Sequence, residues 1–430
     1  MFIKHLTAIA LLAGAFTIFG CASKEERVAE HLAKAKTLYL ESNYKKARLE
    51  LKNVLKIDPK NAEAYYTAGL IEEREQNWPK AYANYAQAIE VMPTHVEAKA
   101  KLGKFYLLSG DTAKAGKIVA ELLAANPNDV AARILKAAIT ARSGDVAKAI
   151  GEAEAAAASA PKDVDAAALL ASLYARNKQP EKAEAAIRRS LQAGATDTTL
   201  RKELIRILLA RKDLKGAEQQ YQSIISSEPH RFEHRQALAL FYNHTKRVAD
   251  AERVLREAIK TDPEDEERYL VLAQFFAGSK RFDQADKELS AGIEALPEAY
   301  KLRFARIELN YGIGQVAKAE AMLDEIIDMD KTGQHGLRAR NQLARIALSK
   351  GDTAAASKRV AEVLKESPRD NDALLLRARV ALNAKQYANA IADLRSVLKD
   401  QPDSLEVIGL LVAAHTLNRE PQLAKETYSN

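Results

Sequence analysis

Helix-breaking and small residues recur along the chain at a fixed spacing of 34 residues. The clearest row is a series of prolines. Each lies one repeat after the one before it, except Pro229, which lies two repeats after Pro161: Pro59, Pro93, Pro127, Pro161, Pro229, Pro263 and Pro297. Ala195 takes the place where the row skips a proline, and the row resumes three residues out of register at Pro368 and Pro402. Because proline cannot continue a helix, each of these positions predicts the end of a helical unit.

An alanine precedes each of these positions by twelve residues, and this second row has no gap. It comprises Ala47, Ala81, Ala115, Ala149, Ala183, Ala217, Ala251, Ala285, Ala319, Ala356 and Ala390, and Ala424 continues it. A further twelve residues upstream, most units carry another small residue: Ala35, Gly69, Gly103, Ala137, Ala171, Ala239, Ala273, Ala344 and Ala378. Ile205 and Ile307 depart from this row. Since antiparallel helices cross closely only where one side chain at the contact is short, each unit is predicted to be a tightly packed helix pair with a polar turn between the helices.

The rows define the expected boundaries of the units. We predict eleven complete units over 28–404, starting at residues 28, 62, 96, 130, 164, 198, 232, 266, 300, 337 and 371, and an incomplete twelfth at 405–430. The three extra residues fall in DKTGQHG at 330–336. This segment predicts either a local break in the register of the units or a longer turn without further effect.

This pattern resembles that of the tetratricopeptide repeat (TPR), whose period is 34 residues. The resemblance covers residues 28–430. It implies an all-α solenoid, in which antiparallel helix pairs stack into a right-handed superhelix with a concave face. It also implies that other proteins bind in this concave groove, which the first helix of each unit mainly lines.

The first residues indicate a secretion signal rather than a part of the fold. Lys4 and His5 precede an uncharged apolar run over 6–19, which is too short to span a bilayer but fits the apolar region of a signal peptide. The run ends at Gly20-Cys21, and Cys21 is the chain's one cysteine. This junction resembles a bacterial lipobox, although Phe19 is bulkier than the usual residue there.

The lipobox resemblance implies an anchor. We expect a signal peptide at 1–20, acyl chains on Cys21 and an acylated tether at 21–27; the alternative is a plain signal peptide with a chance cysteine. Ala22 follows Cys21 in place of the aspartate that retains many such lipoproteins at the inner membrane. The expected location is therefore the outer membrane, with the chain facing the periplasm.

Composition and charge change this picture little. The net charge of +7 is spread along the chain without a basic run, so no nucleic-acid partner is expected. Gly312 and Gly314 form a GxG that follows no predicted strand, which excludes a dinucleotide site. His230 and His234 lie four residues apart, but no third metal ligand is evident. We expect no enzymatic activity, no catalytic residue, no cofactor and no metal.

Candidate binding residues follow from the TPR resemblance, in which the second, fifth, ninth, twelfth and thirteenth positions of a unit face the groove. These positions give a first basic zone of Arg142, Arg176, Lys202 and Arg206, and a second zone of Arg338, Asn341, Arg345, Arg379 and Asn383. More acidic units lie between the zones and offer Glu233, Gln236, Glu267, Gln274, Glu308 and Tyr311. Arginine suits carboxylates and phosphates, so the zones predict an acidic partner; the alternative is a solvated face of mixed charge. Lys202 and Arg206 resemble one element of the carboxylate clamp of chaperone-binding TPR proteins, but the complete clamp is absent.

The leading functional expectation is a lipid-tethered periplasmic scaffold that holds other proteins in its groove. The start of the chain resembles TPR lipoproteins that accompany exosortase-type exopolysaccharide systems. One alternative is direct binding of an acidic polysaccharide by the basic zones. Another is an anchored arm of a longer protein with a catalytic domain elsewhere. Closely spaced apolar residues in 405–412 also predict that this helix needs a further packing partner, so that the chain is expected to be either a fragment of a longer protein or a protein completed by a partner.

Overall fold

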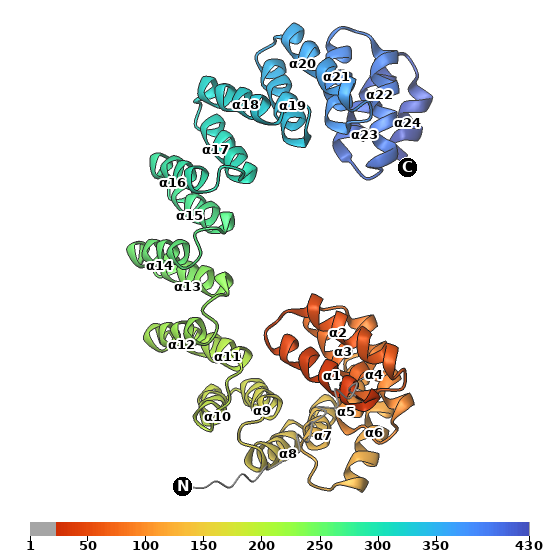
Figure 1. The fold of residues 1–430 in the computed structure, drawn as a ribbon, viewed down its shortest axis with the longest axis vertical. Coiled ribbons are helices and arrows are strands. Elements are labelled where there is room, and N and C mark those ends of the chain that lie inside the picture. Colours follow the sequence, from red (N-terminus) through yellow and green to blue (C-terminus); the bar gives the residue numbers. More distant parts are fainter. Residues whose placement is uncertain (1–22, 430) are drawn as a thin grey trace, which may run out of the picture. The chain divides into compact units, whose positions relative to one another are not determined.

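The computed structural model describes residues 23–429, which form 24 α-helices and no β-strand (Figure 1). The expected signal peptide at 1–20 and Cys21 lie outside the described residues. Within the described range, every helix is too short or too polar to span a bilayer.

The odd-numbered helices are the first helices of the predicted units. They are α1 (Lys24–Leu40), α3 (Ala62–Arg74), α5 (Val96–Leu108), α7 (Val130–Arg142), α9 (Val164–Arg176), α11 (Thr198–Ala210), α13 (Phe232–His244), α15 (Glu266–Gly278), α17 (Tyr300–Gly312), α19 (Gln334–Ser349), α21 (Asn371–Asn383) and α23 (Leu405–Leu417). Ten of these helices begin at the predicted residue. The exceptions are α1, which begins at Lys24 instead of Val28, and α19, which begins at Gln334 instead of Leu337.

The even-numbered helices are the second helices of the units. They are α2 (Tyr44–Ile57), α4 (Trp78–Val91), α6 (Thr112–Ala125), α8 (Val146–Ser159), α10 (Pro180–Gln192), α12 (Leu214–Ser227), α14 (Val248–Thr261), α16 (Phe282–Ala295), α18 (Val316–Asp330), α20 (Thr353–Glu366), α22 (Tyr387–Asp400) and α24 (Pro421–Ser429). Each packs against the first helix of its own unit. The all-α repeat fold is therefore confirmed.

Local sequence sets the ends of these helices. Asp129, Asp163 and Asp370 each precede a first helix and accept a hydrogen bond from the backbone N–H three residues later, at 2.8 Å. Such caps satisfy donors that a helix N-terminus leaves unpaired. Between the two helices of a unit the chain passes through one left-handed residue, for example Gly144 with φ 99°. This residue reverses the chain direction and makes the helix pair antiparallel.

The small-residue rows form the core of the repeats. All eleven alanines of the alanine row, from Ala47 to Ala390, are fully buried, and Ala424 is 7% exposed. Gly69, from the row of small residues twelve positions upstream of the alanines, faces the buried ring of Tyr85, and a Cβ at this glycine would lie 2.4 Å from the ring. The predicted register is thus the register in which the helices pack.

The segment 330–336 forms a tight turn and an extra helical turn. Lys331, Thr332 and Gly333 connect α18 to α19, and α19 gains its additional length at its N-terminal end. The carboxylate of Asp330 accepts the backbone N–H of His335 at 2.7 Å and of Gly336 at 3.2 Å. Gly336 is required here because a Cβ would lie 2.5 Å from the Asp330 carbonyl oxygen. The three extra residues therefore change only this turn and the N-terminal end of α19.

The chain divides into two compact parts, Met1–Ser227 and Glu228–Asn430, which we call the N-terminal part and the C-terminal part. The division falls between α12 and α13, at the boundary of two units. Each part is a run of stacked helix pairs with its own buried core.

Candidate functional site

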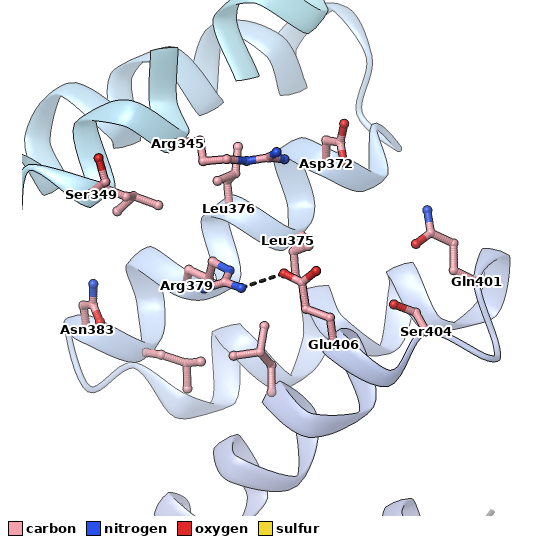
Figure 2. Close-up of a pocket in the computed structure, with 13 residues that line it drawn as sticks. Arg345, Ser349, Asp372, Leu375, Leu376, Arg379, Asn383, Gln401, Ser404 and Glu406 are labelled. Atoms are coloured by element: carbon pink, nitrogen blue, oxygen red, sulfur yellow. Dashed lines mark hydrogen bonds and ion pairs between the residues drawn. The ribbon is translucent and has the colours of Figure 1, made fainter. Parts of the chain in front are cut away.

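A pocket of about 590 Å³ lies in the C-terminal part, between the first helices of three successive units. Helices α19, α21 and α23 line it, together with the loop that leads into α23 (Figure 2). No residue from the helical part of a second helix contributes to its wall. At these three units, the first helices therefore make a hollow face. We call this cavity the groove pocket.

Leucine side chains form the apolar floor of the groove pocket. Leu375, Leu376 and Leu382 come from α21, and Leu348 and Leu410 come from α19 and α23. Leu376 is 2% exposed and belongs to the core, whereas the other four are half-buried and remain accessible from the pocket. The pocket can therefore bury an apolar side chain of a ligand without rearranging the core.

Charged groups stand above this floor. Arg379 of α21 donates a hydrogen bond to Glu406 of α23 at 2.6 Å (Figure 2). The two side chains are 44% and 55% exposed, so their pair is solvated and holds α21 and α23 together only weakly.

Arg345 of α19 is the available cation of the groove pocket. Its side chain is exposed and extends over the pocket in Figure 2. Within residues 23–429, no carboxylate pairs with it. Asn383 and Ser349 add uncharged hydrogen-bonding groups at one end of the pocket, and Asp372 adds a carboxylate. The pocket thus offers a free guanidinium beside an apolar floor.

Comparison with known proteins agrees with the repeat architecture. Two family models described as tetratricopeptide repeat match the chain, one at 74–139, 208–275 and 242–303 and the other at 134–198 and 341–404. Together the matches cover more than half of the chain. The chain belongs to the TPR family. TPR proteins mediate protein–protein interactions, and this is the functional class of the chain. No curated protein matches the sequence.

Solved TPR-like structures resemble the chain at the level of the fold alone. The Naa15/Naa10 complex bound to HypK-THB is 15% identical with a TM-score of 0.41, and the match covers 93% of this chain and 68% of that chain. Yeast Tom70 is 15% identical with a TM-score of 0.41, covering 86% and 91%. Pseudomonas aeruginosa pilF is 16% identical with a TM-score of 0.35, covering 50% and 98%.

The second basic zone is only partly available on this TPR face. Arg345, Arg379 and Asn383 come together in the groove pocket. Arg338 is exposed, but it lies 3.9 Å from Glu308 and 4.0 Å from the centre of the Phe304 ring.

Asn341 does not lie on the open face. It is 3% exposed, and its amide donates to Asp370 at 2.9 Å. The reason is that the turn before α21 packs against α19 at this position. Asn341 is therefore a buried link between two units and cannot contact a ligand as predicted.

The first basic zone lies in the N-terminal part, on α7, α9 and α11. Arg206 pairs with Glu203 of its own helix at 3.0 Å, and this bond raises the pKa of Arg206. Arg142 donates to the backbone carbonyl of Leu107 at 2.8 Å. Arg176 and Lys202 are exposed and have no carboxylate partner among the described residues. The zone thus contains two available cations instead of four.

In the acidic units between the zones, carboxylates also pair with cationic side chains. Glu267 bonds with Lys301 of the next first helix and raises the pKa of that lysine, and Glu308 faces Arg338. A similar link, Lys36 to Glu63 at 2.7 Å, joins α1 and α3. Charge on this face therefore alternates between neighbouring helices and is largely compensated.

Two charged residues of the groove pocket, Asp372 and Glu406, were not among the sequence predictions. Both occupy the second position of their units, so the positional rule contained the signal. The pairing of Glu406 with Arg379, which leaves Arg345 without a carboxylate partner, could not be read from the sequence, because it depends on how α23 packs beside α21.

His230 and His234 lie in different environments. His234 is 3% exposed and its Nε2 lies 2.7 Å from Glu228, whereas His230 is exposed. Over the described residues, no group of three or more His, Cys, Asp or Glu side chains is arranged to hold a metal ion.

Proposed function

We propose that the chain is a binding scaffold whose groove pocket holds a segment of a partner protein. The segment that fits the pocket carries a carboxylate next to a bulky apolar side chain. The observation that carries this proposal is the unpaired Arg345 beside an accessible leucine floor. A guanidinium binds a carboxylate by paired hydrogen bonds, and the leucines provide apolar area to bury.

The wider setting is part of the same proposal. A lipid anchor at Cys21 would hold the scaffold at the periplasmic face of the outer membrane, within an envelope assembly such as an exopolysaccharide export system. The lipobox-like junction at Gly20-Cys21 supports the anchor. Polysaccharide binding by the two basic zones receives less support, since Arg206, Arg338 and Arg379 are each beside a carboxylate.

Labelled peptides with a Leu-Glu-Leu core test the groove pocket by fluorescence anisotropy. We expect binding to the wild-type protein, and loss of at least about tenfold in affinity when Arg345 is changed to Glu, because two like charges then meet. Arg395→Glu is the matched control, since Arg395 is an exposed arginine of the second helix α22.

Two further measurements sharpen this test. A peptide with a Leu-Gln-Leu core lacks the charge and should bind more weakly than the acidic peptide. Added salt should reduce that difference, because exposed charges are screened over about 10 Å at 0.1 M salt. Equal effects of Arg345→Glu and Arg395→Glu would assign the binding to another surface.

A further inference from the structure

Four aromatic residues form a surface on the N-terminal part that the groove does not use. They are Trp78 and Tyr82 of α4 and Phe105 and Tyr106 of α5, and we call them the aromatic surface. None of the four occupies a groove-facing position of its unit. Trp78 is 50% exposed and Tyr82 is 39% exposed, although large aromatic side chains are usually mostly buried.

The rings meet edge to face, which leaves ring faces open. Trp78 and Tyr82 both contact Phe105, with centroid separations of 6.3 and 6.1 Å and interplanar angles of 62° and 71°. Tyr82 contacts Tyr106 at 6.2 Å and 78°. Because an edge-to-face contact covers only one face of one ring, the half-exposed indole of Trp78 can accept a flat group against it.

Packing of the repeats does not require aromatic side chains at this junction. At corresponding junctions the chain uses charged pairs, such as Arg48 with Glu75 and Glu184 with Arg211. In the next unit, Thr112 and Gly116 take the places of Trp78 and Tyr82, and a Cβ at Gly116 would meet nothing within 4 Å. The equivalent positions of the next unit therefore hold small residues, and packing there does not depend on aromatic side chains.

Polar groups lie among the rings. The hydroxyls of Tyr82 and Tyr106 are 3.3 Å apart, so each retains hydrogen-bonding capacity beyond that contact. The ammonium group of Lys114 lies 5.2 Å from the Tyr106 ring centre and 3.0 Å from Asp111. A purely apolar partner would desolvate these groups without replacing their hydrogen bonds, which is unfavourable.

A pyranose ring can contact both the open ring faces and the polar groups of this surface. Its C–H face packs against an aromatic face, and the hydroxyls at its rim hydrogen-bond to phenols and ammonium groups. We propose that the aromatic surface binds a saccharide, with a pyranose ring stacked on Trp78 and its hydroxyls bonded to Tyr82 and Tyr106. This inference concerns a different surface from the groove pocket and does not depend on the proposed function.

Trp78 is the chain's one tryptophan, so intrinsic fluorescence reports directly on this surface. The full chain is titrated with a neutral β-1,4-glucan hexamer, a neutral α-1,4-glucan hexamer and a hexamer of uronic acid. We expect a saturable change in Trp78 emission with at least one of them. If none changes the emission at millimolar concentration, the proposal fails.

Calorimetry on variants then locates the binding. Trp78→Ala should weaken the saccharide at least about tenfold, and Tyr82→Phe should weaken it by a smaller factor because the ring remains. Tyr311→Ala is the control, since Tyr311 is an exposed tyrosine at a groove-facing position of the C-terminal part. Helical circular dichroism verifies that each variant is folded.

Two other results would overturn the proposal. In one, a uronate hexamer binds equally well to Trp78→Ala and is released by salt, which assigns it to cationic groups elsewhere. In the other, the Leu-Glu-Leu peptide changes Trp78 emission and no saccharide does, which makes the aromatic surface a protein interface. Loss of peptide binding at the groove pocket alone leaves the saccharide result standing.

Discussion

Asp286 illustrates how one carboxylate can join two neighbouring units of the C-terminal part. Its oxygens accept two hydrogen bonds from Arg306, at 2.8 and 3.0 Å, and one from Lys318 at 3.0 Å. The buried Asn310 donates a fourth at 2.8 Å. The bonds from Arg306, reinforced by those from Asn310 and Lys318, hold the pKa of Asp286 well below its usual range.

This arrangement predicts a pH-dependent stability. Because the folded pKa is depressed, the contribution of Asp286 is complete above the unfolded pKa of about 3.9 and is lost as the pH falls toward the folded pKa. Asp286→Asn should cost about 1.5–3 kcal/mol at pH 7, and the difference from the wild type should narrow below about pH 4. Urea unfolding across pH 3–7 measures this, with the exposed Asp283→Asn as control. A difference that stays constant with pH would contradict the assignment.

At the scale of the element, the close approach of the two helices of a pair determines which residues can lie at their contact. The alanine row has no exposed surface because the partner helix lies directly against each Cβ. At Gly69 even a methyl group is excluded, since the Tyr85 ring occupies the space that a Cβ would fill. A small residue at these positions is thus a condition for the crossing of the two helices.

The alanine row predicts the effect of a larger side chain. Ala251→Leu should destabilise the C-terminal part by about 1–3 kcal/mol through overpacking. Lys260→Ala on the same helix changes an exposed residue and should stay within about 0.5 kcal/mol. Denaturant midpoints of the two variants provide the comparison, and equal midpoints would show that the register is wrong.

At the scale of the whole molecule, the repeats form two compact parts, and each carries one of the two proposed binding surfaces. The groove pocket belongs to the C-terminal part and the aromatic surface to the N-terminal part. The proposed anchor at Cys21 lies close in sequence to α1, which begins at Lys24. An anchor there would place the N-terminal part near the membrane, since only a few residues separate them.

The proposed anchor gives a test that does not involve the fold. Cys21→Ser should abolish acylation and release the protein from membranes, while its helical circular dichroism and melting temperature stay unchanged. Metabolic labelling with a fatty acid and fractionation measure the first two properties. Labelling of the serine variant equal to that of the wild type would exclude this anchor.

The sequence alone determined the repeat, its period and the first residue of ten of the twelve first helices. It could do so because the signals are local: a proline stop, a polar turn and small residues at fixed spacing. Repetition made each signal visible many times. The extra turn of α19 was missed because Asp330 creates it by bonding to the backbone of the following helix.

Only the tertiary structure decided which candidate residues are available to a ligand. Asn341 and Arg345 lie one helical turn apart on α19, yet Asn341 is buried against Asp370 and Arg345 is exposed without a carboxylate partner. Arg379 has the same position in its unit as Arg345, but Glu406 neutralises it. The repeat pattern specifies the position of each side chain on its own helix. The neighbouring helices belong to other units, and they determine which groups that side chain contacts.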